Sequence, residues 1–365
     1  MSWKSKILII GGTGYLGKFM VKASISMGHP TDVYSRPSTK ASDSSSKIQV
    51  IHDFESMGVH IIQGYLDDYD KLPSVFQQID VVISLLPVPQ HLEQLRIIDA
   101  IKEVGNIKRF FPSEFGVESR RAHSLRPFQR IIDNKKEIQR AIKEAGISYT
   151  IVAGNGFGAY FVDYLLNPQH QRDEITIYGD GHAKAVLNFE EDIAAFTIRS
   201  VDDVCTLNRL VICKPPKNII SQLDMISLRE KRCRKTLKKR YISEEEVIKL
   251  IESLPHPENV GPAILHYLFV AGQSNLELEE DDLELSNLYP DYKYTPIVHL
   301  IDVLALNPSH FLKKSGPGIA SLDRSFFFSK LNSGPGMPSL DRFYFFLQNL
   351  KLQSEDGILE LKLKF

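Results

Sequence analysis

The chain has 365 residues, of which 43% are hydrophobic and 24% charged, and its formal net charge is −1. This length allows one large α/β unit or two closely packed ones. The nearly balanced charge gives no support to a general polyanion partner, so we expect neither a nucleic-acid-binding protein nor an acidic interaction tail.

The cysteines and the N-terminus indicate the compartment. Cys205, Cys213 and Cys233 form no CxxC pair and no Cys/His set with ligand spacing, so we expect no disulfide framework and no metal. The N-terminus runs almost directly into a strand pattern and lacks the apolar region of a secretory signal. No apolar run approaches the ~18–20 residues that a membrane span needs. We therefore expect a soluble, cytoplasmic protein with no membrane partner.

Short apolar runs alternate with longer amphipathic stretches through the first half of the chain. The runs lie at residues 6–10, 31–36, 59–64, 80–86, 109–114 and 149–155. Continuous apolar strands are buried on both faces of a sheet, and their alternation with helices implies right-handed parallel crossovers. The predicted fold class is therefore α/β, with a Rossmann-like doubly wound parallel sheet in residues 1–155.

A glycine-rich segment, "GGTGYLG" at 11–17, follows the first predicted strand and precedes an apolar-periodic stretch. In this context glycines allow a tight turn and close backbone approach to a pyrophosphate, whose oxygens the N–H groups of a helix N-terminus can hold. The segment predicts a dinucleotide-binding site.

The end of the second predicted strand indicates which dinucleotide binds. An NAD site favours an acidic residue there, whereas this strand ends in Arg36 and has Asp32 at its start. The planar guanidinium of Arg36 can meet a 2′-phosphate, which favours NADPH. Lys47 can add a second positive charge, but it can equally be a solvated loop lysine.

The segments after the fourth and fifth predicted strands, at 85–90 and 111–116, are expected to line the same crevice at the carboxyl edge of the sheet. Ser113 and Glu114 lie in the second of them. We interpret both as structural hydrogen-bonding residues.

A lysine lies on the apolar stripe of the helix predicted around residues 131–142. Ile131, Ile138 and Ile142 share one face, and Lys135 falls on it. Burial disfavours a charged amine, so Lys135 can have a lowered pKa and accept a proton near neutrality. Its stem can also lie along apolar surface with the ammonium in water. The spacing leaves both interpretations open.

The pattern becomes less regular after about residue 155. Strands are predicted at 175–181 and 209–215, and helices at 243–254 and 261–272. We expect a smaller substrate-binding region, 156–308, interleaved with the sheet. The basic segment 229–240 is interpreted as a solvated helix face rather than a nucleic-acid site.

The tail, 309–365, contains an 18-residue repeat. The segment 315–328, "SGPGIASLDRSFFF", recurs at 333–346 as "SGPGMPSLDRFYFF". Two copies are too few for a solenoid. We assign the tail no chemistry.

Several collinear segments resemble one plant family. They include "GGTGYLGKFMVKAS" from 11, "KKEIQRAIKEAGISYT" from 135, "GFGAYFVDYLLNP" from 156 and "DDLELSNLYPDYKYT" from 281. The chain resembles the NmrA-like isoflavone reductases, phenylcoumaran benzylic ether reductases and pinoresinol–lariciresinol reductases, and most of all the eugenol and isoeugenol synthases among them. The likeness runs from about residue 5 to about residue 308.

The resemblance implies an NADPH-dependent reductase whose catalytic residue is Lys135. Short-chain dehydrogenases of the better-known type have a tyrosine four residues before this lysine, where this chain has Ile131. In eugenol and isoeugenol synthases the resemblance implies reduction of an ester such as coniferyl acetate through a quinone methide. Such an intermediate adds water readily, so it needs a dry pocket.

The resemblance also implies which residues contact cofactor and substrate. Val88 is the candidate for shaping how the propenyl side chain lies, and the aromatic residues after 155 are placed at the nicotinamide and the substrate. Without the resemblance, such aromatic residues are more often ordinary core. The cofactor-binding set is Gly11, Gly12, Thr13, Gly14, Tyr15, Leu16, Gly17, Arg36, Lys47, Lys135, Asn155 and Phe157, and the substrate-binding set is Val88, Phe157, Tyr160 and Phe161.

One departure from the family pattern bears on the pocket. The family usually has Asn-Cys-Phe where this chain has Asn155-Gly156-Phe157, and we expect the glycine to enlarge or loosen the wall beside the nicotinamide.

Two other functions remain open. One is reduction of a benzylic ether or an isoflavone by the same lysine and cofactor, and the other is a regulator that binds NADPH without turnover. The expected partner is a small phenolic substrate, and a homodimer is left open.

Overall fold

The computed structural model describes residues 4–37, 45–166 and 174–306. The predicted tail and its repeat lie outside these residues. Within the described residues, no helix is long and apolar enough to cross a membrane, and no cluster of His, Cys, Asp and Glu could hold a metal ion.

Five parallel strands form the central sheet in the order β3-β2-β1-β4-β5. They are β1 (Ile7–Ile10), β2 (Thr31–Ser35), β3 (His60–Gln63), β4 (Val81–Ser84) and β5 (Arg109–Phe111). The strand order reverses between β1 and β4, and ligands of open α/β sheets bind outside the carboxyl ends of the strands at such a switch point. The predicted α/β class is confirmed.

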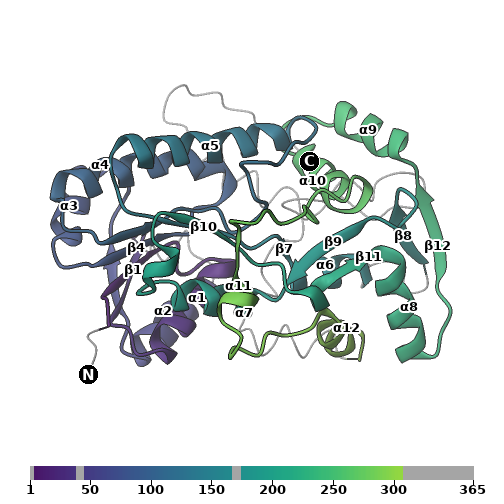
Figure 1. Cartoon of the computed structure of the whole chain (residues 1–365), viewed down its shortest axis with the longest axis horizontal. Helices are drawn as coiled ribbons and strands as arrows, with labels where there is room; N and C mark the ends of the chain where they lie inside the picture. Colours follow the sequence, from purple (N-terminus) through teal and green to yellow (C-terminus); the bar gives the residue numbers. More distant parts are fainter. Residues whose placement is uncertain (1–3, 38–44, 167–173, 307–365) are drawn as a thin grey trace, which may run out of the picture.

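Helices cover both faces of this sheet (Figure 1). Ile7 and Ile9 of β1 belong to a core shared with helices on one face, whereas Leu8 and Ile10 belong to a core on the other. Alternate side chains of a strand point to opposite faces, so an all-apolar strand needs cover on both. The first face carries α1 (Tyr15–Ser26), α2 (Ser45–Ser56) and α7 (Glu190–Arg199), and the second carries α3 (Lys71–Phe76), α4 (Gln94–Val104) and α5 (Phe128–Glu144).

A second parallel sheet, in the order β13-β10-β6, adjoins the first through a bridge between Phe110 and Tyr149. Its strands are β6 (Thr150–Ala153), β10 (Arg209–Ile212) and β13 (Leu283–Glu284). Strand β6 precedes residue 155, whereas β10 and β13 follow it, so both predicted regions contribute strands to this sheet. The predicted division at 155 stays a prediction.

Most of the remaining elements lie beside the central sheet (Figure 1), where they enclose a third core. Its sheets are β11-β9-β7 and β12-β8, from β7 (Gly156–Phe157), β8 (Glu174–Tyr178), β9 (Lys184–Asn188), β11 (Ile219–Ser221) and β12 (Lys238–Ile242). Its longer helices are α6 (Gly158–Leu166), α8 (Gln222–Cys233), α9 (Glu244–Ser253), α10 (Val260–Leu265) and α12 (Ile297–Leu306). Five short elements complete the fold: η1 (Val88–Glu93), η2 (Val204–Thr206), η3 (Pro216–Asn218), a π-helical η4 (His266–Val270) and α11 (Leu285–Leu288).

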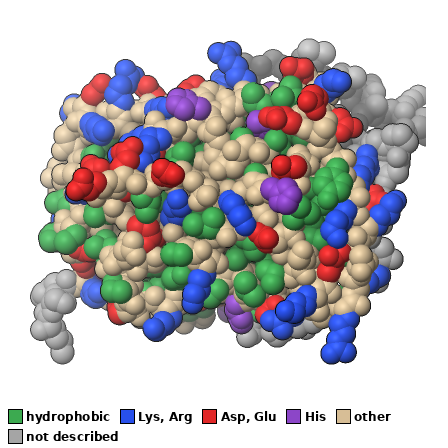
Figure 2. Space-filling model, turned by 45° about the vertical axis from the view of Figure 1, so that its right-hand side comes forward, with side chains coloured by type: hydrophobic (Ala, Val, Ile, Leu, Met, Phe, Trp, Pro, Cys, Tyr) green, Lys and Arg blue, Asp and Glu red, His purple; other side chains and the backbone are tan. Residues whose placement is uncertain are grey.

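The interpretation of residues 229–240 as a solvated helix face holds only in part, because residues 231–236 are exposed but the helix does not continue beyond Cys233. Helix α8 ends at Cys233, Arg234 adopts a left-handed conformation with φ +51°, and the segment continues into β12. The lysines of β12 are paired, Lys238 with Glu174 and Lys239 with Glu230. On the face seen in Figure 2, basic and acidic side chains are intermixed. This arrangement agrees with the balanced charge of the chain.

Candidate active site

The glycine-rich segment forms the turn from β1 into α1. Gly11 has φ +85°, and a Cβ there would lie 2.8 Å from the carbonyl oxygen of Leu85. A Cβ at Gly12 would lie 2.9 Å from the side chain of Val33. Gly14 immediately precedes α1, whose first-turn N–H groups have no acceptor within the helix. This bare turn before a helix N-terminus fits the pyrophosphate of a dinucleotide.

The second strand brings Arg36 to the same edge of the sheet. Arg36 directly follows β2 and is exposed, whereas Asp32 lies at the start of β2 and pairs with Lys6 at 2.9 Å. Lys47 lies in the first turn of α2, so its alternative interpretation as a loop lysine is wrong. A cation at this strand end fits a 2′-phosphate better than free ribose hydroxyls.

Lys135 lies midway along α5, where two cores meet. Phe128 and Ile131 in the first half of the helix pack into the third core, and Ile138 and Ile142 in the second half pack on the central sheet. The side chain between them is 6% exposed. The apolar stripe therefore continues across a boundary between cores, and the amine lies at that boundary.

The amine has a backbone partner. Lys135 Nζ donates to the carbonyl oxygen of Glu114 at 2.6 Å. Burial lowers the pKa of Lys135, and the nearby Glu114 only partly opposes this. A buried amine with a lowered pKa can exchange a proton near neutrality.

The segment that holds Lys135 is itself bonded to its neighbours. The Ser113 N–H donates to Gln94 Oε1 at 2.7 Å, and the Ser113 hydroxyl donates to the carbonyl of Leu86 at 2.8 Å. The carboxylate of Glu114 accepts from the Ser119 N–H and from Gln139. The interpretation of Ser113 and Glu114 as structural hydrogen-bonding residues is confirmed.

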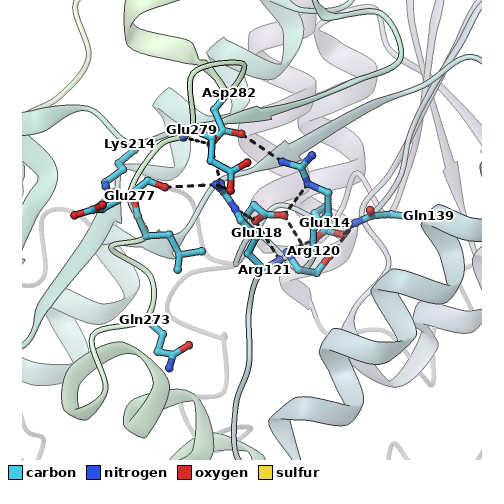
Figure 3. A network of polar contacts seen from close by, with 12 residues as sticks. Glu114, Glu118, Arg120, Arg121, Gln139, Lys214, Gln273, Glu277, Glu279 and Asp282 are labelled. Carbon is cyan, nitrogen blue, oxygen red and sulfur yellow. Dashed lines mark hydrogen bonds and ion pairs between the residues drawn. The ribbon is translucent and has the colours of Figure 1, made fainter.

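An ion-pair network anchors later residues of the same connection (Figure 3). Buried Glu118 accepts from both Arg120 and Arg121. Arg121 also bonds Asp282 at 2.8 Å and Glu279 at 3.1 Å, in the segment before β13. The connection from β5 to α5 is therefore fixed to a distant part of the chain.

Two residues of the site have left-handed backbones. Phe115 has φ +27° and Asn155 has φ +59°, and the Asn155 N–H donates to the carbonyl of Gly116 at 2.8 Å. The Asn155 amide donates to the carbonyl of Cys213 at 2.8 Å. Such strained residues occur where the surrounding structure holds a functional segment in one shape. The cofactor contact of Asn155 stays a prediction.

The aromatic residues form a cluster that includes Tyr15 of α1. The ring of Tyr15 lies 5.9 Å from that of Phe157 and 6.3 Å from that of Tyr160. Phe161 is buried in the third core, 5.7 Å from Phe269, and Val88 packs against the same core. The predicted cofactor and substrate contacts of these residues remain predictions.

The expectation that Gly156 leaves a looser wall is wrong. A Cβ at this position would lie 2.6 Å from the Leu187 side chain and 3.0 Å from the carbonyl of Val186. Leu187 fills the space that a larger residue would take. The wall is therefore closed by a neighbouring strand.

His91 is a feature of the site that the sequence reasoning missed. It lies in η1, which packs against α5, and its side chain is 5% exposed. Burial, followed by the charge of Lys135, lowers the pKa of His91 to about 3. Among the described residues, its Nδ1 is buried without a hydrogen-bond partner. One histidine in a polar segment offers no periodic signal from which this burial could be read.

Comparisons with known proteins agree with this geometry. Residues 3–298 match the NmrA-like family. Isoeugenol synthase 1 of Petunia hybrida is 56% identical over 307 residues, which cover 84% of this chain and 95% of the relative. Eugenol synthase 1 of the same plant is 47% identical over 302 residues, covering 81% and 97%. The solved structure of AtPrR2 with NADP+ and (+)-pinoresinol aligns with a TM-score of 0.77 at 34% identity, covering 83% and 99%.

Proposed function

Because the chain belongs to the NmrA-like family, and within it to the NADPH-dependent reductases of plants, we propose that it converts a phenylpropenyl ester into a phenylpropene. The observation that carries the proposal is the burial of the Lys135 amine, which donates a hydrogen bond to the backbone carbonyl of Glu114 at the carboxyl edge of the sheet. The proposed substrate is an ester of the coniferyl acetate type.

Lys135 starts the proposed reaction. Its lowered pKa leaves a neutral fraction whose Nζ accepts the proton of the para-hydroxyl group. The electrons released from the phenol move through the ring and side chain, the bond to the ester oxygen breaks, and the carboxylate departs. The substrate is then a quinone methide. Once the quinone methide has been reduced, Lys135 returns the proton to the product phenolate.

The fit of the glycine turn and Arg36 supports NADPH as the cofactor. The turn at Gly11 and Gly12 leaves no room for side chains and can receive the pyrophosphate, and Arg36 can receive the 2′-phosphate. When bound, NADPH supplies a hydride. Addition of the hydride to the terminal carbon of the side chain gives isoeugenol, and addition to the benzylic carbon gives eugenol. Phe157 and Tyr160 exclude water beside the reacting carbons.

Relatedness favours isoeugenol as the product. The chain is 56% identical to the isoeugenol synthase of Petunia hybrida and 47% identical to the eugenol synthase of the same plant. A second candidate is reduction of a dimeric lignan ether, because AtPrR2 was solved with pinoresinol. Both reactions would use the same lysine and cofactor.

The test incubates the protein with NADPH and coniferyl acetate and identifies products by chromatography. Isoeugenol is the expected product, and eugenol would correct only the regiochemistry. Parallel incubations contain pinoresinol, a phenylcoumaran and an isoflavone. Turnover of one of these alone would replace the proposal with the sister activity. NADPH binding without turnover of any substrate would identify a non-catalytic regulator.

The choice of cofactor has its own test. Arg36→Ala should weaken the preference for NADPH over NADH by roughly 10- to 100-fold, because a charge-assisted pair with the 2′-phosphate is lost. The measurement is the ratio of kcat/KM for the two cofactors. The matched control is Arg140→Ala, an exposed arginine of α5 that pairs with Glu137. An unchanged ratio in Arg36→Ala would exclude this role.

A further inference from the structure

A buried carboxylate joins the predicted cofactor helix to the aromatic cluster. Glu190, the first residue of α7, is 0% exposed. Its Oε1 accepts the hydroxyl of Tyr15 at 2.5 Å and the N–H of Tyr160 at 3.1 Å. Its Oε2 accepts the N–H of Ala159 at 3.1 Å. This side chain of α7 therefore contacts two other helices, α1 and α6.

Both backbone donors belong to the first turn of α6. N–H groups in a first turn find no carbonyl within their own helix, so they need an acceptor from elsewhere. Glu190 provides it from an element more than 20 residues away in the chain. The position of Tyr160 at the start of α6 therefore depends on Glu190.

The third donor belongs to the glycine turn. Tyr15 is the first residue of α1 and directly follows Gly14. Its hydroxyl is bound to Glu190, while its ring lies beside Phe157 and Tyr160. The hydrogen bond between Tyr15 and Glu190 therefore sets the spacing between the glycine turn and the aromatic rings proposed to line the substrate pocket.

We propose that Glu190 is a positioning residue which, through Tyr15 and Tyr160, aligns the substrate with the dinucleotide and so selects the carbon that is reduced. This inference rests on the proposed function. Glu190 touches neither substrate nor cofactor in this role. It acts by holding the helix at which the dinucleotide binds and the helix that carries the substrate wall in one arrangement.

A similar contact on the same helix provides a matched control. Asp192 of α7 is also buried, and it accepts the hydroxyl of Tyr292 at 2.8 Å and the N–H of Thr295 at 2.7 Å. These partners lie in the segment before α12, away from α1 and α6 in the chain. Tyr292→Phe therefore removes a tyrosine–carboxylate bond of the same kind without touching the aromatic cluster.

The experiment compares Tyr15→Phe, Glu190→Gln, the double variant and Tyr292→Phe. Each of the two single variants at the cluster should change the isoeugenol-to-eugenol ratio by about threefold or more. The double variant should match Glu190→Gln, because Glu190→Gln already disturbs the contact that Tyr15→Phe removes, together with the two contacts to α6. Tyr292→Phe should retain the wild-type ratio. An unchanged ratio in Tyr15→Phe, or independent effects that multiply in the double variant, would overturn the inference.

NADPH binding separates this inference from the proposed function. If the wild-type protein forms no phenylpropene, the proposed function fails, and the dissociation constant for NADPH becomes the readout. Tyr15→Phe and Glu190→Gln should then each weaken NADPH binding by about threefold or more, and the double variant should bind NADPH no more weakly than Glu190→Gln. Equal affinity for NADPH in the wild type and all four variants, with thermal unfolding showing each to be folded, would overturn the positioning role.

Discussion

Lys135 and Glu190 are both buried, yet they are bound in different ways. Among the residues that the structure describes, Lys135 Nζ has one hydrogen-bond partner, the carbonyl of Glu114. Glu190 accepts three hydrogen bonds. Burial moves both groups towards their neutral forms, because it lowers the pKa of Lys135 and raises that of Glu190 to about 6. With a single hydrogen bond, the neutral amine of Lys135 can still accept a proton from a substrate, whereas the three hydrogen bonds of Glu190 fix the positions of its neighbours.

The largest expected effect comes from removing the amine. Lys135→Met should lower kcat by roughly 10²- to 10⁴-fold, the usual contribution of a general acid–base group. NADPH binding should be nearly unchanged, because the glycine turn and Arg36 remain. Steady-state kinetics and NADPH titration measure the two effects. Lys143→Met, an exposed lysine in the last turn of α5, is the matched control. A kcat above a tenth of the wild-type value would assign the proton transfer to another group.

His91 extends the comparison to a buried group without a partner for one nitrogen. Its folded pKa of about 3 lies below the ordinary value of 6.5, so the unfolded chain binds the proton more tightly and stability falls as pH falls below 6.5. Relative to the wild type, His91→Leu should therefore gain about 2 kcal/mol of unfolding free energy at pH 5 compared with pH 7.5.

Urea unfolding at the two pH values measures this difference for His91→Leu. The control is His123→Leu, an exposed histidine of the connection between β5 and α5. Equal gains at pH 5 and pH 7.5 would mean that the imidazole titrates normally in the folded protein.

Glu190 should show the opposite slope and a smaller effect. Its folded pKa of about 6 lies above the ordinary value of 4.5, so its contribution to stability is largest below pH 4.5 and is lost as pH rises through 6. Lowering the pH from 7 to 4.5 should therefore stabilise the wild type by about 1.5 kcal/mol relative to Glu190→Gln. The same urea experiment measures it, and parallel curves for the two proteins would contradict the raised pKa.

The smallest effect is expected from the tail. The hydrogen-bond partners given for Lys135 and Glu190 all lie before residue 191, and the family match ends at residue 298. Deletion of residues 309–365 should leave kcat and KM within about twofold of their values in the full chain. A larger loss of activity would give the tail a part in the site.

Much of the fold could be predicted from local sequence patterns. Continuous apolar runs predicted β1, β2, β4 and β5 because strands buried on both faces need such sequences. The glycine turn was predicted because it is contiguous in the chain. Helical spacing placed Lys135 on the apolar stripe of α5 but left open whether its amine is buried, and the structure buries it. The basic segment 229–240 was partly misread because charge density does not show where a helix ends.

Contacts between distant segments were decided only by the tertiary structure. Nothing near Glu190 in the sequence indicates that its carboxylate reaches Tyr15, 175 residues earlier. Likewise, the spacing on α5 places Lys135 on the apolar stripe, but only packing shows that it lies between two cores. The sequence by itself determined the strands, the glycine turn and the place of Lys135 on the apolar stripe of its helix, because periodicity and turn chemistry are local. The structure decided the partners of the buried charges, because each partner comes from another element.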